Sequence, residues 1–157
     1  MPETLGFDVL HFLYVLSLAL IVGGGFALGS AAAPTLFKEL ERTQAGTVFG
    51  AILERWDAVA VFAAVVLVAT TGLRASVFES GEPIAARWVA VVIVLVATLY
   101  SSAWANPIAR QLRKQTRDFD DLPPQAPERR EFARYHTRSA RAMTLAMLAG
   151  LVALYLS

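Results

Sequence analysis

The feature that most constrains this chain is a long run without formal charge, from Val9 to Ala33. A second uncharged run extends from Trp88 to Ala109. A helix needs about 20 apolar residues to cross the hydrocarbon core of a bilayer, and both runs are long enough. The chain of 157 residues is 56% hydrophobic and only 17% charged, whereas about a quarter of a soluble domain is charged. The sequence therefore predicts an integral membrane protein.

Two shorter apolar runs, Ala58 to Leu73 and Ala142 to Ser157, are candidates for two further spans. Each reaches only about 24 Å at 1.5 Å per residue, so the charged turns beside them must snorkel or pair near the membrane. We therefore predict an all-α fold in which residues 1–157 form one four-helix transmembrane bundle. The expected spans cover residues 9–33, 54–74, 84–107 and 136–156.

The basic residues predict the orientation of the bundle. Every lysine and arginine except Arg74 and Arg87 lies on the side of the connections between spans one and two and between spans three and four. The positive-inside rule places that side in the cytoplasm, with both termini outside. Helices two, three and four should extend on that side, around a cytoplasmic loop at 110–130. We expect a multi-pass protein of the plasma or inner membrane.

Two prolines interrupt the predicted spans. Pro34 follows the first uncharged run, and Pro107 follows Asn106 near the end of the third span. Proline lacks the backbone N–H and its ring clashes with the carbonyl of residue i−4. We therefore expect Pro34 to close or kink the first helix and Pro107 to kink the third.

The two short spans carry opposite charges where they enter from the cytoplasmic side. Glu54 and Asp57 share one helix face, and a second face carries three arginines at i, i+4 and i+7. These are Arg134, Arg138 and Arg141. A carboxylate near hydrocarbon is costly unless it is paired, so we predict that these faces meet, with His136 nearby. The alternative is that the arginines reach lipid phosphates and the acids face water.

The two histidines are too far apart to share a cofactor. His11 lies near the outer end of the first span and His136 near the inner end of the fourth, about 30 Å apart in depth at 1.5 Å per residue. His136, Met143 and Met147 share one face, and imidazole with thioethers suits a soft ion such as Cu(I). Methionines at helical spacing are more often packing residues. The sequence identifies no cofactor.

Small residues on the first span indicate close helix packing. Gly25, Gly29 and Ala33 form a row at i, i+4 and i+8, which lets two helix backbones approach. A homo-oligomer is expected, with membrane lipids as further partners. The basic loop also contains Asp118, Asp120 and Asp121, which favours a lipid-facing surface over a nucleic-acid interface. No constellation of catalytic residues is found in the sequence, which argues against an enzyme.

Three segments resemble one known family. The run Leu10 to Ser17, followed by glycines, resembles the first helix of the transmembrane protein 205-like family, a membrane domain of unknown function. Phe132, His136 and Ser139 resemble its Phe-x-x-x-His-x-x-Ser motif, and the segment from Gln44 to Leu53 resembles its second helix. The family is distantly similar to copper-resistance D-type membrane proteins and four-helix haem proteins. The resemblance implies transport, export or trafficking.

Three functions therefore stand as hypotheses. The first is transport, export or channel-like handling of a small solute or metal ion, along a polar path or gate. Its candidate residues are His11, Glu54, Asp57, Arg134, His136, Arg138 and Arg141. The second is a haem- or quinone-binding redox protein, and the third is a structural or assembly protein without a ligand.

Overall fold

The computed structural model describes the backbone of residues 2–79 and 85–157 and the side chains from Leu5 onward within those ranges. The chain is all-α over this part. It begins with α1 (Pro2–Ala27), η1 (Leu28–Ala32), α2 (Ala33–Glu39) and α3 (Arg42–Val77). The second half holds α4 (Ala85–Thr98), η2 (Leu99–Ala105), α5 (Asn106–Gln115), the short 3₁₀ turn η3 (Phe119–Asp121) and α6 (Pro127–Tyr155).

The prolines do not end their helices. A π-helical stretch, η1 or η2, comes just before Pro34 and Pro107, and helix continues beyond each proline to Glu39 and Gln115. The i−4 carbonyls that the proline rings would meet belong to Ser30 and Ala103, inside these stretches. Wider i→i+5 turns accommodate the ring without a break. The first helix therefore does not close at Pro34, and the alternative of a kink there stays a prediction.

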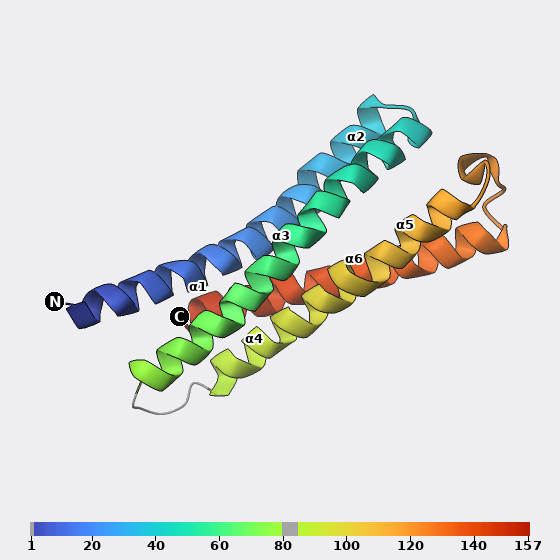
Figure 1. The fold of residues 1–157 in the computed structure, drawn as a ribbon. Coiled ribbons are helices and arrows are strands. Elements are labelled where there is room, and N and C mark those ends of the chain that lie inside the picture. The colour runs from blue at the N-terminus through green and yellow to red at the C-terminus, as the bar shows by residue number, and fades with distance from the viewer. Residues whose placement is uncertain (1, 80–84) are drawn as a thin grey trace.

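The helices form two antiparallel hairpins that pack side by side, as Figure 1 shows. One hairpin contains α1, α2 and α3, and the other contains α4, α5 and α6. Both chain termini and the facing ends of α3 and α4 lie at one end of the bundle, called here the termini end. The α2–α3 and α5–α6 turns lie at the opposite end, which carries most of the basic residues and is called here the basic end. As predicted, the connections between helices one and two and between helices three and four share one end, and both termini lie at the other.

The core lies where all four long helices meet, on the termini side of the bundle. Leu18 from α1, Leu67 from α3 and Val91 and Val94 from α4 are fully buried there. Small side chains such as Ala149 of α6 let the fourth helix approach the other three. Toward the basic end the two hairpins diverge. There α2 packs against α3, and α5 packs against α6.

Three helical segments are long and apolar enough to cross a membrane. They are Leu5–Glu39, Arg42–Val77 and Ala85–Gln115. Their outer faces expose large apolar side chains such as Phe12, Phe62 and Val96, as a lipid-facing surface does. These features indicate a membrane-embedded protein. The helix α6, whose apolar part follows Arg138 and Arg141, is not among the three, so the fourth span stays a prediction.

Helices extend beyond the apolar spans at the basic end, as predicted. There α3 already begins at Arg42. Within the predicted connection at 110–130, α5 continues to Gln115 and α6 starts at Pro127. Only residues 116–126 lie between these two helices, and Arg110 belongs to α5.

Candidate functional site

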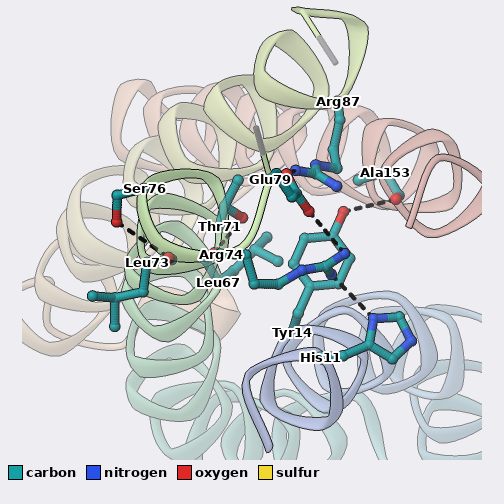
Figure 2. A network of polar contacts seen from close by, with 10 residues as sticks. All are labelled: His11, Tyr14, Leu67, Thr71, Leu73, Arg74, Ser76, Glu79, Arg87 and Ala153. Atoms are coloured by element: carbon teal, nitrogen blue, oxygen red, sulfur yellow. Dashed lines mark hydrogen bonds and ion pairs between the residues drawn. The ribbon is translucent and has the colours of Figure 1, made fainter. Parts of the chain in front are cut away.

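A polar cluster at the termini end joins all four long helices (Figure 2). Glu79, just past the end of α3, lies between two buried arginines. Its carboxylate pairs with Arg74 of α3, Nη2 to Oε1 at 3.1 Å, and with Arg87 of α4. Arg87 is only 2% exposed, and a buried guanidinium is costly unless a carboxylate neutralises it. The pair therefore fastens α3 to α4.

Arg74 also reaches the first helix. Its Nη1 donates to Nδ1 of His11 at 3.1 Å, and its guanidinium lies over the rings of Phe7 and Tyr14, 5.0 and 5.2 Å from their centroids. Because Nδ1 accepts, the proton of a neutral His11 ring is on Nε2. The Tyr14 hydroxyl donates to the carbonyl of Ala153 in α6 at 2.7 Å. The cluster thus binds α1 to α3 and to α6.

The charges of this cluster depend on Glu79. The hydrogen bond from Arg87, together with the charges of Arg87 and Arg74, holds the pKa of the Glu79 carboxyl below its usual value. Glu79 therefore stays ionised at neutral pH and keeps both arginines paired.

A second, buried polar cluster lies toward the basic end. Asp57 of α3 is 4% exposed and accepts hydrogen bonds from Asn106 Nδ2 at 2.8 Å and from Arg110. Ser139 of α6 donates to Asn106 Oδ1 at 2.5 Å. Ser101 lies 2.8 Å from the Ser139 hydroxyl, so Ser101 must be the donor there. One directed chain of hydrogen bonds therefore runs from Ser101 to the Asp57 carboxylate.

Two adjoining cavities lie against this cluster, between the diverging hairpins. The larger, about 500 Å³, extends to the basic end, and the smaller, about 240 Å³, reaches the buried cluster. The two share the lining residues Ala33, Phe49, Leu53, Asn106 and His136. Arg42, Arg110, Arg113 and Arg129 line the larger cavity, and Asp57, Ser101, Ser102 and Ser139 line the smaller one. The pair forms a basic vestibule with a polar bottom, called here the basic-end vestibule.

The predicted meeting of two charge faces is wrong. Asp57 takes Arg110 of α5 as its partner instead of an arginine of α6. Glu54 and the three predicted arginines are exposed and form no ion pair among the described side chains. These arginines are Arg134, Arg138 and Arg141. Asp57 and Arg110 project from helices that pack together, whereas the α6 arginines face outward.

The structure separates the two histidines, as predicted. His11 belongs to the termini-end cluster, and His136 stacks on Phe132 and lines both cavities. Met143 and Met147 line the smaller cavity with His136. No group of three or more His, Cys, Asp or Glu side chains suited to a metal occurs within 5–79 and 85–157. A soft-metal site therefore stays a prediction.

The row of small residues serves two purposes. A Cβ at Gly25 would lie 2.9 Å from the Met147 sulfur and 3.0 Å from Met143 Cε, so this glycine allows α1 and α6 to approach closely. A Cβ at Gly29 would meet nothing within 4 Å. Gly29 and Ala33 instead widen the smaller cavity.

Sequence reasoning missed most members of both clusters. The positive-inside count treats Arg74 and Arg87 only as exceptions, yet a basic pair on the sparsely charged side is a signal for a buried partner such as Glu79. Asn106 stands inside an apolar run, and an amide at such a position predicts a buried hydrogen bond. No sequence pattern pairs Ser139 with Asn106.

Comparison with known proteins gives one match. The model of a family described as Domain of unknown function (DUF4149) matches residues 16–118. The chain belongs to this family. The DUF4149 region includes Asp57, Asn106 and Arg110 as well as Glu79 and its two arginines, and it stops before α6. No curated protein and no solved structure matches the chain. The resemblances to the transmembrane protein 205-like and copper-resistance D-type families stay predictions.

Proposed function

We propose that this DUF4149 protein transports, exports or conducts a small solute, which enters through the basic-end vestibule. The observation that carries the proposal is the buried Asp57 cluster at the bottom of that vestibule. Ionisable groups within membrane spans are costly, and they commonly mark ion or substrate pathways.

The difference between the two ends supports this proposal. At the termini end, Arg74, Glu79 and Arg87 fasten α1, α3 and α4, and Tyr14 adds α6. Between the ends lies the apolar core around Leu18, which excludes polar solutes. In this proposal the termini-end cluster is a closed gate, the core is the barrier, and the vestibule is the open half of the path.

A second candidate rests on the wall of the smaller cavity. His136, Met143 and Met147 line it together, so a soft metal ion is the alternative solute or cofactor there. The volume of about 240 Å³ is below the roughly 300 Å³ at which ligand pockets begin, which favours an ion over haem or quinone. A structural role without a ligand is the third candidate.

The proposal also includes the expected orientation, the fourth span and the oligomeric state. The basic end faces the cytoplasm of a plasma or inner membrane, α6 is the fourth span, and the protein works as a homo-oligomer. The chain contains no cysteine, so single cysteines introduced at Ala133 and Ala86 report sidedness without background. An impermeant maleimide should label Ala86→Cys from outside intact cells and Ala133→Cys only after the membrane is opened. The reverse pattern refutes the orientation.

Flux into proteoliposomes tests the function. Protons, divalent metal ions, small inorganic anions and a short-chain amphipathic anion serve as probes. At least one should cross faster than in protein-free vesicles, and Asp57→Asn should reduce its flux by about tenfold. Glu54→Gln is the matched control, because Glu54 lies on the same helix but is exposed. Transport fails as a function if no probe crosses, and the Asp57 path fails if both variants behave alike.

A further inference from the structure

The basic-end vestibule has an excess of positive charge. Four arginines line its larger cavity, and the acids beside them are Asp120, which lines it, and Asp57 at its bottom. Four positive charges less two negative charges leave a net charge of +2. A cavity with this charge attracts an anion.

The charge is uncompensated at the mouth rather than at the bottom. Arg110 is paired with Asp57, and Arg113 with Asp120, Nη2 to Oδ2 at 2.9 Å. Arg129 donates only to the backbone carbonyls of residues 120 and 122, and Arg42 forms no ion pair among the described side chains. Arg42 and Arg129 are therefore the two charges left for a ligand.

The rest of the wall is apolar. The larger cavity is also lined by Phe37, Phe49, Leu53 and Phe132. Its volume of about 500 Å³ falls in the range of roughly 300–1,000 Å³ that is usual for ligand pockets. A charged mouth on an apolar cavity matches an amphiphile with an anionic head and a hydrocarbon body.

The vestibule lies at the head-group level of the membrane. Arg110, which lines the larger cavity, directly follows the uncharged run that ends at Ala109, so it lies at the membrane interface, where lipid phosphates are found. Its partner Asp57 lies beside it. The vestibule therefore extends from the interface toward the basic end, within reach of lipid head groups.

Glycines hollow out the α3 side of this space. Gly46 and Gly50 line the larger cavity, and a Cβ at Gly50 would meet nothing within 4 Å. Glycine inside a helix costs about 0.5–1 kcal/mol relative to alanine, so these positions weaken α3 while they widen the cavity. Gly50 is therefore a site at which a larger side chain fills the vestibule without disturbing packing.

We propose that the basic-end vestibule binds one anionic phospholipid of the surrounding membrane, with its phosphate on Arg42 and Arg129 and an acyl chain along Phe49, Leu53 and Phe132. The inference rests on the proposed function in taking this cavity as the ligand site, and it makes the solute an amphipathic anion. Arg113 and Arg110 stay paired with their aspartates while the lipid is bound.

Native mass spectrometry of the full chain released from nanodiscs tests this. The nanodiscs contain phosphatidylglycerol and phosphatidylcholine in equal amounts, and dodecyl phosphate is titrated in a separate arm. One phosphatidylglycerol per protomer should remain bound. Arg42→Gln with Arg129→Gln should weaken its binding by at least about tenfold, since each charge-assisted hydrogen bond contributes about 1.5–3 kcal/mol. Gly50→Leu should abolish it and Val48→Leu, on an exposed face of α3, should not.

Several results overturn the proposal. Equal retention of phosphatidylcholine refutes the preference for an anionic head group. Binding of dodecyl phosphate without binding of phosphatidylglycerol refutes a membrane phospholipid as the ligand. Unchanged lipid binding in Gly50→Leu places the lipid elsewhere. If Gly50→Leu instead dissolves an oligomer, a second copy of the chain occupies the vestibule. Lipid bound in this way with no flux of any probe refutes transport and leaves the lipid site intact.

Discussion

The Asp57–Arg110 pair makes the sharpest prediction, because it links α3 to α5 inside the bundle. Arg110→Leu removes one partner and leaves a carboxylate that is 4% exposed with only the Asn106 amide donating to it. Breaking a buried pair in this way costs about 3–5 kcal/mol. Since Asn106 remains, we expect the lower value, about 3 kcal/mol, which corresponds to a fall in Tm of about 6–12 °C for a chain of this size.

The assay is thermal unfolding in detergent, followed by circular dichroism. Arg117→Leu is the matched control, because Arg117 is 95% exposed and its contact with Asp118 contributes little. Adding Asp57→Asn to Arg110→Leu removes the buried charge and should restore more than half of the lost stability. Equal Tm values for Arg110→Leu and Arg117→Leu, or no recovery in the double variant, refute the reasoning.

Three further predictions concern the termini end and the glycines. Tyr14→Phe loses the hydrogen bond to α6 and should cost about 1 kcal/mol in a thermal melt. The pKa of Glu79 is lowered in the folded protein, so its ion pairs stabilise the fold at pH values above its ordinary pKa of 4.5. This stabilisation is lost as pH falls through the folded pKa, and Glu79→Gln should remove the resulting acid dependence of Tm. Gly24→Ala should destabilise by about 1–3 kcal/mol, since its Cβ would overlap the ring of Trp56, whereas Gly29→Ala has open space and should be tolerated.

Much of the fold was predictable because the bilayer leaves few solutions. Uncharged runs had to be helices, and four successive antiparallel helices place alternate connections at the same end. What the sequence did not reveal was how a helix continues through a proline. The π-helical stretches before Pro34 and Pro107 let each helix continue, whereas a proline by itself predicts a break or a kink.

The sequence predicted that a carboxylate of the candidate site is paired, but not which arginine pairs with it. Asp57 was identified as a carboxylate that needs a counter-charge, and the structure provides one. Several arginines at helical spacing were equally suitable by sequence. Which arginine pairs with Asp57 depends on η2. Its wider turns change which of the following residues face α3, and these include Asn106 and Arg110.

The distribution of polar contacts decides which half of the molecule can rearrange. The termini-end cluster includes α1, α3, α4 and α6, whereas the buried cluster near the basic end includes α3, η2, α5 and α6 but not α2. The helix α2 packs mainly against α3 among the long helices, and it contributes no side chain to either cluster, so moving α2 breaks no hydrogen bond of these clusters. Opening the termini end instead requires separating Glu79 from two buried arginines. The vestibule side of the bundle is therefore the side that can widen at low cost, and a ligand that bridges Arg42 and Arg129 would draw its two walls together.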